Sequence, residues 1–202
     1  MIRLYQSPTS PFCHRVRIVL AEKELDYQII PIDLSKKENR TEQFLRLNPL
    51  GKVPVLADDD LILSESLVIN EYLNEEYAYP ELMPEDSQEK AQVRLWSSQI
   101  DTMIARPFAE FYFAQRAKET GESFDAARLE SAQQTIYQFL EFVDKSMRDK
   151  EYLVGSYSLA DIAFAPWTTR FEKYGIALPQ NLPHAEAWMK RLITKHTVVS
   201  TR

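Results

Sequence analysis

The sequence of 202 residues contains a single cysteine, Cys13, and only three histidines. One cysteine excludes an intramolecular disulfide and is typical of a reducing compartment, so we expect a cytoplasmic protein. The histidines, His14, His184 and His196, are scattered and do not form the spacing of a zinc-binding helix. The sequence therefore predicts no metal site.

Long hydrophobic runs and an excess of basic residues are also missing. No segment approaches about 18 consecutive apolar residues, and residues 1–5 have a strand pattern without a signal-peptide core, so we expect neither export nor membrane insertion. The net charge is −6, which argues against direct binding to nucleic acid. A hydrophobic content of 45% supplies an ordinary core for one large or two modest domains.

The first part of the chain alternates between strand and helix patterns. Strands are expected at 2–6, 27–32, 53–57 and 61–63, and helices at 10–23, 40–47 and 65–77. The polar run Asp58-Asp59-Asp60 predicts a tight turn between two antiparallel strands. The order βαβ, a further helix and then ββα predicts a thioredoxin-like domain with a mixed four-stranded sheet over residues 1–77.

The rest of the chain has helical periodicity. Residues 78–86 contain Pro80 and Pro84 and are expected to form a linker. Helices are then expected at 87–118, 124–148, 158–173 and 184–194. Pro107 lies inside the first of these and should kink or split it. The predicted fold class is α/β plus all-α, with residues 87–202 forming a helical bundle domain.

The segment Ser10-Pro11-Phe12-Cys13 has the form of a two-cysteine redox motif in which serine replaces the first cysteine. A serine hydroxyl cannot form a disulfide, but it can donate a hydrogen bond to the thiolate of a bound molecule. Serine followed by proline also starts helices in proteins of any function. The motif indicates a protein that activates a bound thiol only if other residues deliver that thiol to Ser10.

Two further motifs could bind such a ligand. Pro54 opens a strand, where a cis bond after Val53 would leave the Val53 N–H and carbonyl free to pair with an extended peptide. Glu65-Ser66 starts a helix whose N–H groups and Ser66 hydroxyl could hold a carboxylate, with Glu65 facing an ammonium. Each motif alone is equally compatible with an ordinary strand or helix start. Together they predict a small peptide with a thiol and an α-amino acid head, and glutathione fits.

The chain resembles the cytosolic glutathione transferases over nearly its whole length. The resemblance rests on the first strand with Leu4-Tyr5, on Arg15-Val16-Arg17, on Asn48-Pro49-x-Gly51-Lys52-Val53-Pro54, on Glu65-Ser66 and on Ser158-Leu159-Ala160-Asp161. It implies that Ser10 activates the thiol and that Val53 pairs with the cysteinyl backbone of glutathione. It further implies that Glu65 and Ser66 hold the γ-glutamyl end, that Lys52 lies near the glycyl end, and that the protein is a homodimer.

Other residues of chemical interest have structural alternatives. Ser158 and Asp161 have the spacing of a helix-capping box and are predicted to serve folding. Met103, Phe108 and Tyr112 lie on the helix that borders the electrophile pocket in the family that the chain resembles, although such an aromatic face is also typical of a core.

The predicted activity is attack of the activated glutathione thiolate on a small hydrophobic electrophile, either as conjugation in detoxification or as reversible addition during isomerisation. One alternative is a glutathione-dependent thiol transferase or reductase that uses Cys13. A second alternative comes from residues 79–84 and 158–166, which also resemble the stringent starvation protein A group, proteins of this fold that associate with RNA polymerase.

Overall fold

The computed structural model describes residues 1–202 and contains two units of packed chain. The first unit comprises Met1–Leu82 together with His196–Arg202, and the second comprises Met83–Lys195. The boundary between Leu82 and Met83 falls inside the predicted linker. Residues 196–202, however, were expected in the helical domain and instead pack with the first unit.

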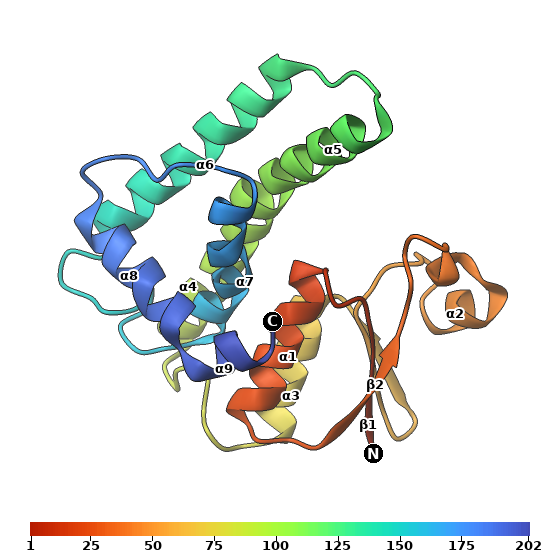
Figure 1. Cartoon of the computed structure of the whole chain (residues 1–202). Helices are drawn as coiled ribbons and strands as arrows, with labels where there is room; N and C mark the ends of the chain where they lie inside the picture. Colours follow the sequence, from red (N-terminus) through yellow and green to blue (C-terminus); the bar gives the residue numbers. More distant parts are fainter. The chain divides into compact units, whose positions relative to one another are not determined.

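The first unit has the predicted thioredoxin-like architecture. Its sheet has the strand order β2-β1-β3-β4, with β1 parallel to β2 and antiparallel to β3. Helices α1 and α3 lie on one side of this sheet and α2 lies on the other (Figure 1). The elements are β1 (Ile2–Gln6), α1 (Pro11–Glu22), β2 (Tyr27–Pro31), the 3₁₀ helix η1 (Glu38–Arg40), α2 (Glu42–Leu47), β3 (Val55–Asp58), β4 (Leu61–Ser64), α3 (Ser66–Glu76) and α9 (His196–Ser200).

The register of the sheet defines its two ends. Tyr5 of β1 is paired with Val55 of β3, and Val55 is paired in turn with Ser64 of β4. We call this the Val55 end. At the other end Asp58 is paired with Ile2 and with Leu61, and we call it the Asp58 end.

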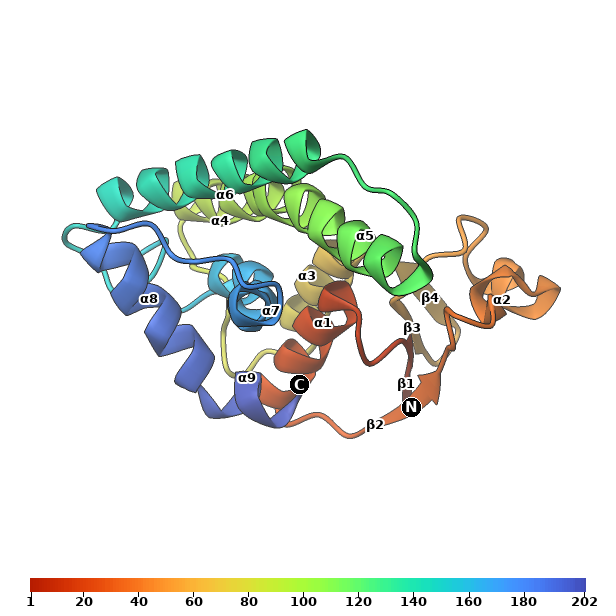
Figure 2. The same ribbon diagram turned by 45° about the horizontal axis from the view of Figure 1, so that its top comes forward.

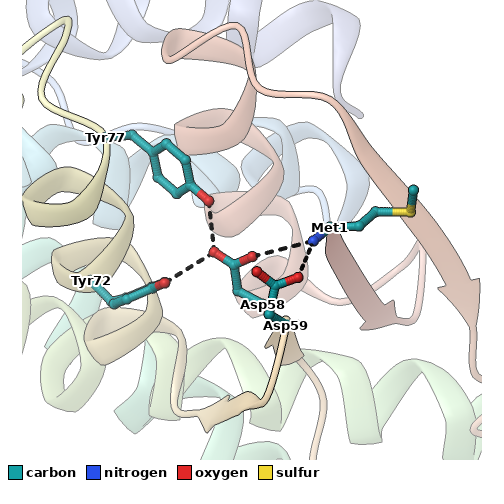
Figure 3. A network of polar contacts seen from close by, with 5 residues as sticks. All are labelled: Met1, Asp58, Asp59, Tyr72 and Tyr77. Carbon is teal, nitrogen blue, oxygen red and sulfur yellow. Dashed lines mark hydrogen bonds and ion pairs between the residues drawn. The ribbon is translucent and has the colours of Figure 1, made fainter.

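A polar network closes the Asp58 end (Figure 3). The Asp58 carboxylate accepts hydrogen bonds from the hydroxyls of Tyr72, at 3.0 Å, and Tyr77, at 2.6 Å. The amino group of Met1 lies 2.6 Å from Asp59 and 3.8 Å from Asp58. Burial and the hydrogen bond to Asp58 raise the pKa of Tyr72 to about 12, and the separate hydrogen bond from Tyr77 to Asp58 raises the pKa of Tyr77. The network therefore ties the C-terminal end of α3 to the Asp58 end of the sheet.

A Tyr77→Phe substitution is expected to lower the free energy of unfolding by about 1–2 kcal/mol, because it removes a hydrogen bond to a carboxylate and leaves the ring in place. Urea unfolding followed by circular dichroism measures the change. Tyr79→Phe is the matched control, since Tyr79 is 88% exposed. Equal stability of the two variants would show that the Asp58 network contributes nothing measurable.

The second unit is helical. Its elements are α4 (Ser87–Ile100), the π-helical turn η2 (Asp101–Ala105), α5 (Arg106–Thr120), α6 (Ala126–Ser146), α7 (Leu159–Lys173) and α8 (Pro183–Thr194). The single helix expected at 87–118 is thus interrupted by η2, and Pro107 stands in the first turn of α5, where it needs no N–H partner. The predicted interruption is confirmed. None of the helices combines the length and the hydrophobicity that a membrane-spanning segment needs.

Helix α7 forms the core of this unit and packs against α4 and α8 (Figure 2). Residues Leu159–Thr168 are all buried. Asp161, which is fully buried, accepts hydrogen bonds from Ser158 N at 3.0 Å, Ser158 Oγ at 3.1 Å, Leu153 N at 3.1 Å and Trp188 Nε1 at 2.8 Å. The predicted capping box is confirmed, and its carboxylate additionally joins α8 and the preceding loop to α7.

Candidate functional site

The three motifs predicted to bind a thiol peptide converge at the Val55 end of the sheet. Ser10 follows the end of β1, Val53 precedes Val55 by two residues, and Ser66 follows Ser64 by two residues. Since Tyr5, Val55 and Ser64 are register neighbours on adjacent strands, the segments that carry these residues leave the sheet side by side. Helices α1 and α3 both begin at this end and pack against each other (Figure 2).

Ser10 is the N-cap of α1. Its backbone is extended (φ −76°, ψ 124°), and its Oγ accepts a hydrogen bond from Cys13 N at 3.3 Å. Pro11 occupies the first helical position, and the first turn contains no acidic residue. The Ser10 hydroxyl proton is not used in the capping bond, so it can be donated to an anion placed at the positive end of α1.

Cys13 has no solvent-exposed surface. Burial raises the pKa of its thiol, against the opposing effects of hydrogen bonds from Ser10 and Ser7 and of the charge of Arg17. A nucleophilic cysteine needs an accessible thiolate, and Cys13 has the environment of an inert core thiol. The geometry thus argues against the thiol transferase alternative.

The loop before β3 is held by the side chain of Asn48. Its Nδ2 donates to the Lys52 carbonyl at 2.8 Å, and its Oδ1 accepts from Leu50 N at 3.1 Å. Gly51 is required here, because its φ is +63° and a Cβ would lie 2.9 Å from the backbone carbonyl oxygen of Asn39. The hydrogen bonds of Asn48 and the conformation of Gly51 therefore fix the shape of the loop.

At the end of this loop the backbone of Val53 is unpaired. The Val53–Pro54 bond is cis, and no hydrogen bond within the chain uses the N–H or carbonyl of Val53. These groups are available to an extended peptide, as predicted. The neighbouring Lys52 is exposed and can supply a positive charge.

The start of α3 carries the third motif. Glu65 is exposed, adopts φ +70°, and does not use its side chain to cap the helix. Such a conformation is strained for a residue with a side chain, and strain of this kind concentrates at ligand sites. Ser66 is buried at the first position of the helix, where its hydroxyl and the free N–H groups can receive a carboxylate.

The residues expected at the electrophile pocket lie in the second unit. Phe108 is 2% exposed and packs against the rings of Phe111, Trp167, Phe171 and Tyr174, with ring centroids between 5.2 and 6.2 Å apart. Met103 is partly exposed and Tyr112 is 45% exposed. Only Met103 and Tyr112 therefore offer surface to a ligand, and the pocket stays a prediction.

Two features of the site were not predicted. The first is the role of Asn48, whose presence in the Asn-Pro-x-Gly motif is the sequence signal for it. The second is Arg17, which is almost completely buried on α1 and contacts both the loop before Ser10 and residue 201. Nothing in the local sequence indicates that contact. The structure contains no group of three or more His, Cys, Asp or Glu side chains that could hold a metal ion.

Comparisons with known proteins identify the family of the chain. Residues 1–75 match the family model of the glutathione S-transferase N-terminal domain, and residues 100–195 match that of the C-terminal domain. Glutathione S-transferase F13 of Arabidopsis thaliana is 31% identical over 96% of this chain and 91% of its own length. Maleylacetoacetate isomerase of Rattus norvegicus is 33% identical over 87% of this chain and 80% of its own length.

Among solved structures, glutathione transferase F7 of Populus trichocarpa superposes with a TM-score of 0.89 at 28% identity, covering 100% of this chain and 97% of that one. Both domain models and relatives that span nearly the whole chain thus agree with the thioredoxin-like sheet and the helical unit. The chain belongs to the glutathione S-transferase family.

Proposed function

We propose that Ser10 of this glutathione transferase donates a hydrogen bond to the thiolate of bound glutathione, which then attacks a small hydrophobic electrophile. The observation that carries the proposal is the convergence of Ser10, Val53 and Ser66 at one end of adjacent strands. In this arrangement Val53 pairs with the cysteinyl backbone, and Glu65 and Ser66 hold the γ-glutamyl ammonium and carboxylate. Lys52 attracts the glycyl carboxylate.

The free energy needed to ionise the thiol of bound glutathione at neutral pH is modest. A free thiol has a pKa near 8.5, so only a few per cent is ionised at neutral pH. Lowering that pKa by about two units requires about 2.7 kcal/mol. A hydrogen bond to a charged group supplies about 1.5–3 kcal/mol and a helix N-terminus adds about 0.3–1 kcal/mol. The Ser10 hydroxyl and the start of α1 are therefore sufficient to hold the sulfur as a thiolate.

The electrophile is received, in this proposal, on the exposed surfaces of Met103 and Tyr112, while Phe108 supports them from the core. The enzyme acts in the cytoplasm as a homodimer, as the family resemblance implies. Exposed apolar side chains in each unit support a partner copy: Leu50 and Val68 in the first, at 59% and 53% exposure, and Leu95 and Phe142 in the second, at 50% and 44%.

A Ser66→Ala variant is expected to bind glutathione roughly tenfold more weakly than wild type, because it loses a hydrogen bond to the γ-glutamyl carboxylate worth about 1.4 kcal/mol. Isothermal titration with glutathione measures the change. Ser98→Ala is the control, since Ser98 is an exposed serine of α4 in the other unit.

Failure of the wild type to bind glutathione at all would contradict the proposed function. It would favour the alternative of a protein related to stringent starvation protein A, which is then tested by retention on immobilised RNA polymerase.

The similarity to a maleylacetoacetate isomerase favours a second candidate activity, glutathione-dependent isomerisation of a conjugated double bond. The same thiolate would add to the double bond and be eliminated after rotation, so no additional catalytic group is needed. Parallel assays with maleylacetoacetate and with an activated aryl halide distinguish isomerisation from conjugation. A clear preference for the aryl halide would eliminate the isomerase assignment.

A further inference from the structure

Arg17 binds three acceptors in two segments of the first unit that lie far apart in sequence, residues 6–8 and residue 201. Its Nη1 donates to Gln6 Oε1, its Nη2 donates to the Pro8 carbonyl at 3.3 Å, and its Nε donates to the Thr201 carbonyl at 2.8 Å. The side chain is almost completely buried. Because the guanidinium is planar and rigid, three simultaneous bonds fix its acceptors relative to one another.

Two of these acceptors belong to the connection that leads to Ser10. Gln6 ends β1, and Pro8 lies in the exposed turn that is closed by the hydrogen bond from Ser10 N to the Ser7 carbonyl at 3.1 Å. Arg17 lies two turns further along α1 than Ser10. Its hydrogen bonds therefore hold the segment between β1 and α1 against the helix that Ser10 caps. The position of the Ser10 hydroxyl depends on this turn as well as on the helix.

The third acceptor belongs to residues 196–202, which we call the return segment because it packs back on the first unit. The return segment lies along α1 (Figure 1). His14 Nε2 donates to the Val198 carbonyl at 3.2 Å, and Thr197 Oγ1 donates to Glu22. With Arg17, these contacts are spaced along one face of α1, and they bury Val198 completely.

We propose that Arg17 is a positioning residue for thiol activation, and that the return segment holds its guanidinium in the orientation that places the Ser10 hydroxyl at the sulfur of glutathione. The inference rests on the proposed role of Ser10. Hydrogen-bond catalysis requires placement within about 0.5 Å, so a small displacement of the Ser7–Ser10 turn is sufficient to weaken the bond to the thiolate.

The test compares Arg17→Lys with Arg17→Gln in the full-length protein, and measures the pKa of the bound glutathione thiol from the ultraviolet absorbance of the thiolate. Lysine keeps the positive charge but cannot bond three acceptors in one plane, whereas glutamine removes the charge as well. Both variants are expected to raise the thiol pKa by about one unit and to lower kcat/KM at pH 6.5 about tenfold. Because glutathione contacts other residues, its dissociation constant should change less than about twofold.

Deletion of residues 199–202 removes the Thr201 carbonyl and leaves Arg17 unchanged, and it is expected to raise the thiol pKa in the same direction. Thr197→Val is the matched control, because it removes the bond to Glu22 at the far end of α1 and leaves the Arg17 contacts in place. Circular dichroism and the melting temperature report folding for every variant.

A wild-type thiol pKa in folded Arg17→Lys would overturn the positioning role, as would an equal shift in Thr197→Val. A raised thiol pKa in Arg17→Gln together with a wild-type thiol pKa in Arg17→Lys would show that the charge alone explains the effect, and would overturn the positioning role. An unshifted thiol pKa in the wild type itself would instead overturn the proposed role of Ser10, and the positioning role with it.

Discussion

Ser10→Ala is expected to reduce kcat/KM for conjugation about 10- to 100-fold at pH 6.5, with little change in glutathione affinity. The hydroxyl contributes a hydrogen bond to a charged group, worth about 1.5–3 kcal/mol, and one pKa unit corresponds to about 1.4 kcal/mol. Without it, the thiol pKa rises by one to two units and less thiolate is present. The loss should shrink as pH approaches the raised pKa, because the thiol then ionises without help.

The measurement is kcat/KM as a function of pH, together with the thiolate absorbance of the glutathione complex. Ser10 is also the N-cap of α1, so alanine is expected to cost about 1 kcal/mol of stability in addition. Ser10→Asp separates the two effects, because aspartate caps a helix but cannot donate a hydrogen bond when ionised. This variant should be stable and inactive.

Cys13→Ala is the control for the neighbouring thiol. Since Cys13 is buried, its loss should leave the pH profile unchanged apart from a modest loss of stability. A normal pH profile in Ser10→Ala, or a lost thiolate signal in Cys13→Ala, would reverse the assignment of the two residues.

Asp161→Ala is expected to have the largest effect on stability, lowering the free energy of unfolding by about 3–5 kcal/mol. The substitution leaves the backbone N–H groups of Leu153 and Ser158 and the indole N–H of Trp188 without acceptors in the core of the second unit. Urea unfolding measures the loss. Asp149→Ala, which removes an exposed carboxylate, is the control and should change stability by less than about 0.5 kcal/mol.

The effect of Asp161 also depends on pH. Burial raises the pKa of Asp161 from 3.8 to about 6, against four hydrogen bonds that favour the charged form. Between these values the folded protein binds more protons than the unfolded chain, so the stability contributed by this group is lost as pH rises through 6. The stability difference between wild type and Asp161→Ala should therefore be about 1 kcal/mol larger at pH 5 than at pH 7. A difference that grows toward pH 7 would mean that the carboxylate has a lowered pKa instead.

The architecture was largely predictable, because local signals and tertiary structure agree in the first unit. Ser10 caps a helix and the ring of Pro11 fixes φ near the helical value, so this pair starts a helix. The run Asp58-Asp59-Asp60 reverses the chain between two strands. The site motifs could be found for a related reason, since Val53 and Glu65 stand immediately beside strand ends. The motifs lie together because of the order of the strands in the sheet. The alternation of strands and helices in the sequence already restricted the possible strand orders.

The parts that were missed depend on contacts between distant residues. The helix α9 spans only His196–Ser200, too short for its periodicity to be distinguished from the end of a bundle. The partners of the return segment, His14 and Arg17, lie more than 180 residues before the residues that they contact, and no local pattern joins them. Phe108 illustrates the same limit, because its spacing with Phe111 and Tyr112 fits a pocket wall or a core, and only the packed rings of α7 show that it is core.

The return segment has a consequence for how the protein is made. Chains emerge from the ribosome from the N-terminus, and domains usually fold as units in that order. Here the face of α1 that carries His14 and Arg17 is covered only when residues 196–202 have been synthesised. The nascent thioredoxin-like unit therefore keeps part of α1 exposed while the whole helical unit is translated. During that interval the exposed face of α1 is accessible to a chaperone or to a second nascent chain.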